Sequence, residues 1–375
     1  MLPRHVYVHV PFCARRCVYC DFSIAVRRDV PVGEYVSAIA REIDTRFGDG
    51  EPWSASTLYL GGGTPSRLGA SGVGRLLNTL TRRIELAADA EVTLEANPDD
   101  VTAHAAAAWR DAGVTRLSLG AQSFDDGVLA WMHRTHDSTQ IARAIDAARV
   151  AGLEDISVDL IFSLPDGLRR SWQADLERAL ALEPAHVSLY GLTIEPHTPL
   201  GRWRDRGQVA ESPDERYETE FLMAHDVLAG AGFDHYEVSN FARPARRARH
   251  NSAYWKRVPY AGLGPSSHGF DGVERRWNES AYAEWRRRLS DGEDAIAGRE
   301  FLAREEEAAE SVYLGLRTSD GLDIATDEIP RVSAWVEQGW ATLKGSNRVV
   351  LTPLGWLRLD ALAADLTVDR SRYYI

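Results

Sequence analysis

The residues of this chain best suited to chemistry are its three cysteines. Cys13, Cys17 and Cys20 are the only cysteines among 375 residues, and they stand in the segment PFCARRCVYCDF. Three thiolates leave one position of a four-coordinate site open. The spacing therefore favours an iron–sulfur cluster with one iron available to a further ligand.

Other uses of three cysteines explain this segment less well. Cysteines that only pack in a core would be scattered along the chain. A disulfide framework normally needs an even count in a short chain, and MLPRHVYVHV lacks the pattern of a signal peptide, so we expect a reducing, cytoplasmic location. A structural zinc site needs a fourth Cys or His close by, but Cys20 is followed by Asp-Phe-Ser.

The composition is that of a globular protein with ample core. Hydrophobic residues make up 44% of the chain, the net charge is -12, and no apolar run is long enough to span a bilayer. An acidic chain is not typical of proteins that bind nucleic acid over a broad surface. The segment ARPARRARH, which ends at His250, is a local exception. Its arginines are either a solvated face or a site for carboxylates or phosphates.

Six short runs of β-branched and aromatic residues alternate with amphipathic stretches, which predicts βα units and a parallel sheet. The runs cover residues 5–10, 56–60, 92–96, 115–120, 156–162 and 186–192. Helical spacing of apolar residues is seen in two series between them: Val36, Ile39, Ile43 and Phe47, and then Val73, Leu76, Leu77, Leu80 and Ile84. The segment Ser212–Glu215 predicts a capping box that opens a further helix.

The unusual residues follow these strands, and the carboxyl ends of parallel barrel strands are where chemistry collects. In strand order they are the cysteine loop, Gly61–Pro65, Glu95–Pro98, Gln122, Asp159 and Tyr190. Glycines let a ligand approach the backbone closely. Glu95 and Asp159 are carboxylates inside β-like runs, where burial is costly without a polar cavity or a partner. We therefore expect one rim that holds a cluster, a backbone loop and two carboxylates.

The motif Cys-x3-Cys-x2-Cys, with Tyr19 directly before the last cysteine, resembles the signature of radical S-adenosylmethionine (SAM) enzymes. In that family the three thiolates hold a [4Fe-4S] cluster, and SAM chelates the remaining iron. More narrowly, the chain is similar to the oxygen-independent coproporphyrinogen III oxidase branch and, within it, to the HemW-type heme chaperones. The matching blocks run from residue 7 to 255: YVHVPFC, LGGGTPS, LEANP, RLSLGAQSF, VDLIFSLP, GLTIEPHTPL and HNSAYW.

The resemblance implies a set of cofactor ligands at matching positions. It implies an α/β fold, a partial (β/α)6 TIM-like radical SAM barrel with a small C-terminal helical, winged-helix-like domain. Cys13, Cys17 and Cys20 would hold the cluster, Tyr7 would contact SAM, and Tyr19 would lie against its adenine. The remaining SAM-binding residues would be Gly62, Gly63 and Thr64 at the methionyl part, with Glu95, Gln122, Arg134 and Asp159.

Two departures from the oxidase favour the chaperone group. Where the oxidase has a further cysteine this chain has Phe22, and only twelve residues precede Cys13. In the chaperone group the histidine of HNSAYW is implicated in holding heme, which makes His250 the first heme candidate, with Tyr254 and Trp255 as stacking residues. His268 is a second candidate ligand.

The tail from about residue 300 predicts helix, turn, helix, β-hairpin and helix, as in a winged-helix module. VSAWVEQGWATL, the helix that would enter a DNA groove, has few basic residues, so we expect it to cover the site or meet a partner. The predicted division is a barrel over 1–235, a linking segment over 236–299 with the heme-candidate motif, and a C-terminal module over 300–375.

The function that the resemblance implies is a heme chaperone, which binds a [4Fe-4S] cluster, SAM and heme and delivers heme to respiratory hemoproteins. A radical decarboxylase of coproporphyrinogen III and a related radical SAM methyltransferase stay open as alternatives. No nucleic-acid partner and no transmembrane segment are expected, while peripheral membrane contact and a homodimer stay open. Catalytic residues are not assigned.

Overall fold

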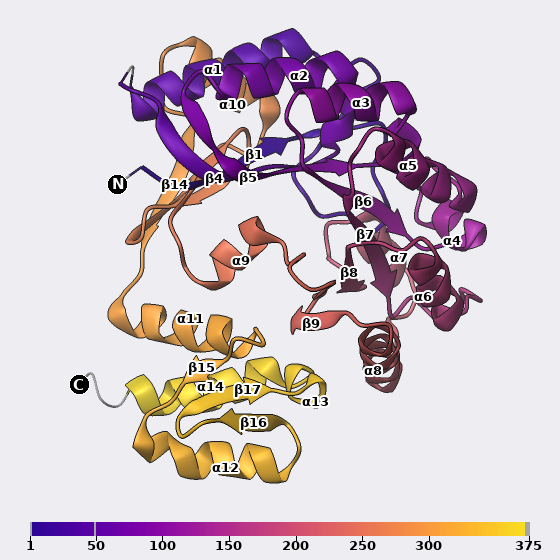
Figure 1. Cartoon of the computed structure of the whole chain (residues 1–375), viewed down its shortest axis with the longest axis vertical. Helices are drawn as coiled ribbons and strands as arrows, with labels where there is room; N and C mark the ends of the chain where they lie inside the picture. The colour runs from indigo at the N-terminus through magenta and orange to yellow at the C-terminus, as the bar shows by residue number, and fades with distance from the viewer. Residues whose placement is uncertain (1, 49, 372–375) are drawn as a thin grey trace.

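A computed structural model describes residues 2–48 and 50–371 of the chain. All six predicted strands are present, hydrogen-bonded side by side and parallel. In order they are β1 (His5–Val10), β4 (Trp53–Gly62), β5 (Ile84–Ala96), β6 (Arg116–Gln122), β7 (Asp155–Phe162) and β8 (His186–Gly191). Figure 1 shows them as an open arc, as expected for a partial barrel.

Helices cover the outer, convex face of this arc (Figure 1). They are α1 (Val32–Phe47), α2 (Gly69–Leu80), α3 (Ala103–Asp111), α4 (Asp126–Trp131), α5 (Ser138–Val150), α6 (Trp172–Ala181) and α8 (Asp214–Gly230), with the short α7 (Pro199–Asp205) beyond β8. The apolar alternate residues of the strands, such as Val6, Leu58 and Leu117, are fully buried in the core. The free energy of burying this apolar surface is what holds sheet and helices together.

The other alternate residues of the strands are polar and line the inner face. In β5, for example, Val92 and Leu94 belong to the core while Glu91, Thr93 and Glu95 occupy the opposite face. Successive side chains of a strand point to opposite sides of a sheet. A barrel that encloses a ligand can therefore be apolar outside, against its helices, and polar inside.

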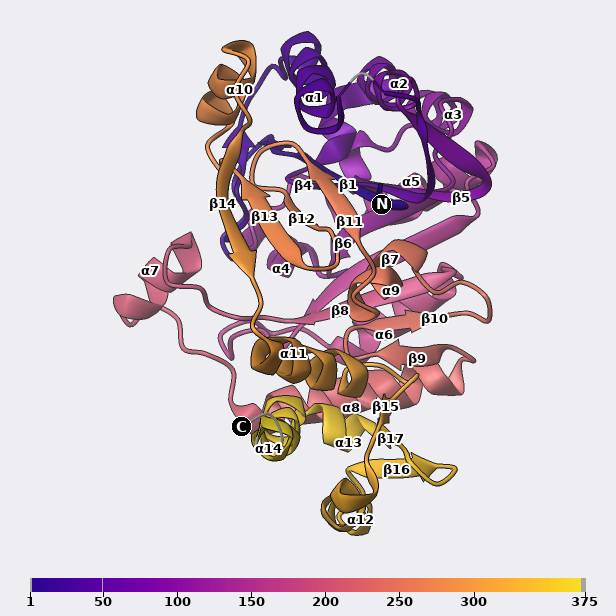
Figure 2. The same cartoon turned by 90° about the vertical axis from the view of Figure 1, so that its left-hand side faces the viewer.

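The sheet extends beyond the predicted six strands at both edges. At one edge β8 is followed by the antiparallel β10 (Asn240–Ala242) and β9 (Asp234–Glu237). At the other, β11 (Tyr260–Leu263) pairs parallel to β1 and leads into the antiparallel β12 (His268–Phe270), β13 (Glu274–Asn278) and β14 (Ile296–Phe301). Helix α10 (Tyr282–Ser290) lies between β13 and β14 and contacts α1. Figure 2 shows this strand layer leading toward α11.

The short helix α9 (Arg249–Trp255), which contains HNSAYW, lies inside the arc rather than on its outer face (Figure 1). Its first two backbone amides, those of Arg249 and His250, donate to the carboxylate of Glu91 on β5 at 2.8 and 2.9 Å. Glu91 therefore caps the helix and ties it to the barrel floor, since a helix N-terminus has unpaired N–H groups.

The tail forms a small sheet with helices on it, in the predicted order. Its elements are α11 (Arg304–Leu316), β15 (Leu322–Asp323), α12 (Ile329–Glu337), β16 (Ala341–Lys344), β17 (Arg348–Leu351), α13 (Pro353–Trp356) and α14 (Leu359–Ser371). The strand order is β15–β17–β16. The division of the chain at residues 235 and 299 stays a prediction. In the described part of the chain, no helix is long and apolar enough to cross a membrane.

Two local predictions are wrong. Ile84 does not continue helix α2, which ends at Leu80; it begins β5 and pairs with Trp53. Ser212 does not cap α8, whose N-cap is Pro213, without a side-chain hydrogen bond. Ile84 continues the apolar spacing of α2 although the helix has already ended, and Ser212 lies one residue before the observed N-cap. Apolar spacing and capping motifs do not fix the exact residue at which a helix begins or ends.

Candidate functional site

A cavity of about 360 Å³ lies at the carboxyl ends of the six strands, and we call it the cofactor cavity. It collects every predicted cluster and SAM residue except Tyr7: Cys13, Cys17, Tyr19, Cys20, Gly62, Gly63, Thr64, Glu95, Gln122, Arg134 and Asp159. Tyr7 lines an adjoining cavity, in which its hydroxyl lies 3.1 Å from His9 Nδ1. The structure therefore brings together, at the strand ends, residues that lie up to 146 positions apart, from Cys13 to Asp159.

The cysteine loop is closed by a two-residue strand pair, β2 (Phe12–Cys13) with β3 (Ala25–Val26). This pair places Cys13 beside Thr64, with 3.4 Å between Sγ and Oγ1. Burial raises the pKa of Cys13, and it raises the pKa of Cys20 to about 11. Burial thus favours the protonated form of the Cys13 and Cys20 thiols, and a metal that binds them must displace these protons.

Arg134 links the cysteine loop to the strand ends. Its guanidinium donates to Cys17 Sγ at 3.4 Å and also to Asn97 Oδ1 at 2.6 Å and the Gly120 carbonyl at 2.8 Å. A cation beside a thiolate stabilises the ionised sulfur. Gly120 leaves room for this arrangement, because a Cβ there would lie 3.2 Å from the guanidinium.

Glu95 is held on the inner face with two partners. Its carboxylate accepts from Tyr59 Oη at 2.8 Å and from the Gly62 amide at 3.0 Å. Burial, opposed by the Tyr59 hydrogen bond and assisted by the nearby charge of Asp159, raises the pKa of Glu95 to about 7. A buried carboxylate with an elevated pKa is suited to accept a hydrogen bond from a cationic or hydroxyl group of a ligand.

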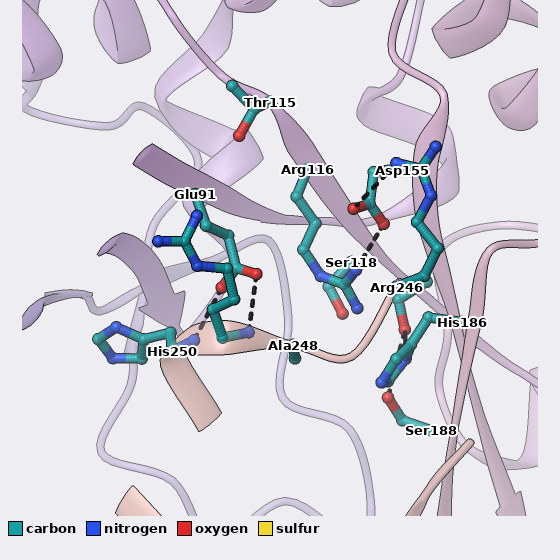
Figure 3. Close-up of polar contacts among 12 residues, drawn as sticks. Glu91, Thr115, Arg116, Ser118, Asp155, His186, Ser188, Arg246, Ala248 and His250 are labelled. Atoms are coloured by element: carbon teal, nitrogen blue, oxygen red, sulfur yellow. Dashed lines mark hydrogen bonds and ion pairs between the residues drawn. The ribbon is translucent and has the colours of Figure 1, made fainter. Parts of the chain in front are cut away.

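Asp159 is supported by a chain of polar side chains on the inner face. The Ser118 hydroxyl donates to it at 3.0 Å and the Ser157 hydroxyl at 3.2 Å. Because Ser157 donates its one proton to Asp159, the 2.8 Å contact with His186 Nδ1 requires that nitrogen to carry hydrogen. His186 Nε2 then accepts from Tyr236 Oη at 2.8 Å. Figure 3 shows part of this network beside the Arg116–Asp155 ion pair.

The glycine loop lets the backbone pass close to the cysteines. A Cβ on Gly63 would lie 2.6 Å from the Pro11 carbonyl oxygen and 3.1 Å from Cys13 Sγ, and Gly62 has φ +113°. Any larger residue would displace the cysteine loop or fill the cavity. The glycines therefore form a cradle at the place where the resemblance puts the methionyl part of SAM.

Two polar residues of the site were not predicted. They are Tyr59 and Ser118, which hold Glu95 and Asp159. Asn97 was expected at the rim as part of the segment 95–98, but its hydrogen bond to Arg134 was not. The signal that could have found Tyr59 and Ser118 is the alternation of polar and apolar residues along each strand. The pairing of Arg134 with Asn97 has no such signal, because only tertiary contacts bring the two side chains together.

His250 is not exposed to an open cavity. Its side chain is 1% exposed, Nδ1 is hydrogen-bonded to Thr57 Oγ1 at 2.7 Å, and Nε2 to Tyr254 Oη at 2.8 Å. Burial, together with His5, lowers the pKa of His250 to about 3, so the ring is neutral. Figure 3 shows the start of its helix against Glu91. Its assignment as a heme ligand stays a prediction, and such ligation requires at least one of these two bonds to break.

The other heme candidates lie around two further cavities. Tyr254 and His268 line the adjoining cavity that contains Tyr7, together with Glu95 and Gly62 of the cofactor site. Tyr254, Trp255 and His268 also line a larger cavity between α9, β11–β13 and α11. The structure thus brings Tyr254, Trp255 and His268 together.

Comparison with known proteins identifies the family. The model of the radical SAM superfamily matches residues 7–179. The heme chaperone HemW of Synechocystis is 35% identical over 94% of this chain and 90% of that protein, and the one of Mycobacterium tuberculosis is 36% identical over 97% and 95%. This chain belongs to the HemW family of radical SAM proteins.

The HemW family assignment agrees with the fold. Coproporphyrinogen III oxidase (HemN) of Escherichia coli, described as a radical SAM enzyme, superposes with a TM-score of 0.81 over 97% of this chain and 89% of that one. At 22% sequence identity, this likeness shows the shared barrel and no more. The prediction of a partial radical SAM barrel is confirmed.

The site fits the cofactors that radical SAM membership implies, a [4Fe-4S] cluster and SAM. Among the described residues, no three His, Cys, Asp or Glu side chains could hold a single metal ion. The three thiols nonetheless line one cavity, and in an iron–sulfur cluster separate thiolates bind separate irons. The glycine cradle and the carboxylates of Glu95 and Asp159 supply the backbone and acceptor groups that SAM's amine and hydroxyls need.

Proposed function

We propose that this chain is a heme chaperone that holds a [4Fe-4S] cluster and SAM in the cofactor cavity, binds heme next to it, and passes the heme to hemoproteins. The observation that carries this proposal is the adjoining cavity. Tyr254 of HNSAYW shares it with Glu95 and Gly62 of the cofactor site. The motif and the cofactor residues are far apart in the sequence, but they line the same cavity.

In this proposal each group of residues has its own task. Cys13, Cys17 and Cys20 hold the cluster, which when bound supplies an iron that SAM can chelate. Arg134 stabilises the charge on Cys17 through its 3.4 Å contact. Glu95 and Asp159 orient the polar groups of SAM, and the Tyr59 hydroxyl holds the Glu95 carboxylate in place at 2.8 Å.

Delivery to respiratory hemoproteins in the cytoplasm is also part of this proposal, and it is supported by the family resemblance alone. The names of the relatives from Synechocystis and Mycobacterium tuberculosis state a heme chaperone. Association as a homodimer and peripheral contact with a membrane stay predictions.

The test is anaerobic reconstitution with iron and sulfide, followed by titration with ferric heme and then by mixing with an apo-hemoprotein. We expect a cluster absorption band, a saturable Soret change, and transfer of the heme to the acceptor. Absence of saturable heme binding by the reconstituted full chain would contradict the proposal.

The same reconstituted protein distinguishes the alternative function. Incubation with coproporphyrinogen III, SAM and a reductant should leave the porphyrinogen unchanged. Formation of protoporphyrinogen with consumption of SAM would instead assign the radical decarboxylase. Phe22, which is 62% exposed at the edge of the cofactor cavity, is the residue that departs from the oxidase pattern there.

A further inference from the structure

A second large cavity, of about 510 Å³, lies between α9, the strands β11–β13 and helix α11. We call it the aromatic cavity, because five of its lining residues are aromatic: Tyr254, Trp255, Tyr260, Phe270 and Trp277. Its volume is in the range of small-molecule and cofactor sites. Aromatic walls of this kind favour a flat, largely apolar ring system, since ring faces stack on one another.

His268 stands at the boundary of this cavity. It lines both the aromatic cavity and the adjoining cavity that reaches Glu95 and Gly62. Its ring is stacked on Trp277, with 5.8 Å between the ring centroids. In the described part of the chain, no hydrogen bond involves its ring nitrogens. A metal could therefore bind His268 without breaking an existing interaction.

His250 differs from His268 in this respect. It is buried, and both of its ring nitrogens are hydrogen-bonded. One of those bonds goes to Tyr254, whose ring lines the aromatic cavity. The geometry makes His250 a positioning residue for Tyr254 and leaves His268 as the imidazole that can reach a ligand.

Two arginines lie at the same cavity and are joined by one carboxylate. Arg257 Nε lies 2.7 Å from Glu310 Oε2, and Arg275 pairs with the other oxygen of Glu310. Both arginines also lie over the Phe270 ring, at 5.6 and 5.7 Å. Glu310 belongs to α11 in the C-terminal module. Its carboxylate lies between the two guanidinium groups, which is the position that an anionic group of a ligand would take.

We infer that the aromatic cavity is the heme site, with His268 as an axial ligand, and that a heme propionate replaces Glu310 between Arg257 and Arg275. This inference rests on the proposed function, because it assumes that the chain binds heme. The exchange is balanced in kind: one carboxylate leaves the two guanidinium groups and another takes its place. The exchange replaces one charge-assisted carboxylate contact with another of the same kind, so both guanidinium groups remain paired.

The first experiment separates the iron ligand from the rest of the site. Reconstituted full-length protein is titrated with ferric heme and, separately, with metal-free protoporphyrin IX. His268→Ala should weaken ferric heme binding at least tenfold and shift its Soret band, with the wild-type spectrum restored by added imidazole. Binding of the metal-free porphyrin should change less than twofold. His104→Ala, which removes an exposed histidine on α3, is the matched control.

The second experiment tests the carboxylate exchange with metal-free protoporphyrin IX, which needs no axial ligand. Glu310→Gln should bind it several-fold more tightly than wild type, because the competitor of the propionate is gone. Arg275→Gln should bind it several-fold more weakly. Glu305→Gln, an equal charge change at an exposed position of the same helix, should have no effect. The dimethyl ester of the porphyrin, which lacks propionate charge, should not distinguish Glu310→Gln from wild type.

These outcomes also separate the two proposals. If wild-type protein binds ferric heme and His268→Ala binds it equally well with the same spectrum, the heme site is elsewhere and the inference is overturned while the chaperone proposal stands. If Glu310→Gln weakens porphyrin binding, the carboxylate exchange is wrong. If wild-type protein binds no heme, the proposed function itself fails.

Discussion

The cofactor cavity and the aromatic cavity are built in opposite ways. The first is lined by residues at the ends of six consecutive parallel strands, and its charged groups, such as Glu95 and Asp159, are already held by hydrogen bonds. The second is formed where the chain returns to the barrel edge as β11 and its following strands, and where α11 covers them. A site of the first kind is set by local strand order. One of the second kind depends on contacts between distant segments.

The difference is also visible in how each site would receive its ligand. The cofactor cavity has an arginine, Arg134, whose two terminal nitrogens donate to Cys17, Asn97 and the Gly120 carbonyl. The arginines of the aromatic cavity are engaged with a glutamate from another part of the chain, which a ligand carboxylate can replace. The first site is suited to a resident cofactor, whereas the second is suited to a ligand that must enter and leave.

The largest effect is expected for the cysteines. Cys17→Ser should remove essentially all cluster iron and the brown colour of the reconstituted protein, because the thiolate is the iron ligand. If the two cavities are independent, metal-free protoporphyrin should still bind. Iron content and absorption spectra check this, with Ala14→Ser, which adds a hydroxyl to the same loop, as control. Cluster iron at the wild-type level in Cys17→Ser would contradict the assignment.

A large loss of stability is expected where the segment from residue 260 to 290 packs against α1 of the barrel. Glu42 of α1 is fully buried and accepts from the Gly264 amide at 2.8 Å and from Trp285 Nε1 at 3.1 Å. Glu42→Ala leaves these donors unpaired, and we expect it to lower the free energy of unfolding by about 3–5 kcal/mol. Urea denaturation measures it.

Glu34 provides the control for that change, since it lies on the same helix and pairs with Arg286 of α10 at the surface. Glu34→Ala should cost less than about 1 kcal/mol. Equal losses in the two variants would mean that the segment from 260 to 290 is not fastened through Glu42.

The two histidines should differ in stability as sharply as they differ in exposure. His250→Ala removes a buried ring with two hydrogen bonds and should lower the free energy of unfolding by about 2–4 kcal/mol. His268→Ala should change it by less than about 1 kcal/mol, because the side chain is exposed. Denaturation of the two variants side by side provides the measurement, and the reverse order of effects would show that their structural roles are exchanged.

A smaller, pH-dependent effect is expected for Glu95 in protein without cofactors. Its pKa is about 7 in the folded chain against 4.5 for an ordinary Glu. Because the folded pKa is the higher one, the favourable contribution is present below about pH 4.5 and is lost as the pH rises through 7. From pH 5 to pH 8 this group should therefore remove about 2–3 kcal/mol of stability.

Glu95→Gln cannot titrate, so its stability should fall less than that of wild type over the same pH range. Thermal or urea unfolding at several pH values measures the difference. Glu85→Gln, an exposed position of the same strand, should follow wild type. A Glu95→Gln profile parallel to wild type would show that the carboxylate does not carry this pH dependence.

The part of the site that could be predicted is the part tied to strand ends. Glu95 and Asp159 were expected there because a carboxylate in a β-like run needs a polar cavity, and the structure brings both to the cofactor cavity. Tyr59 and Ser118 follow the same alternation and were within reach of the same argument. Strand β11 was not, since YAGL is short and its pairing with β1 is a contact across more than 250 residues.

The amino-acid sequence by itself determined the cysteine motif, the six βα units and the family, because these depend on local spacing and on the order of segments along the chain. Only the tertiary structure decided which histidine is available to a ligand. HNSAYW makes His250 conspicuous in the sequence, but burial and two hydrogen bonds engage its ring, while His268 remains exposed beside aromatic walls. Solvent exposure and hydrogen bonding are properties of contacts between distant segments, and no local pattern encodes them.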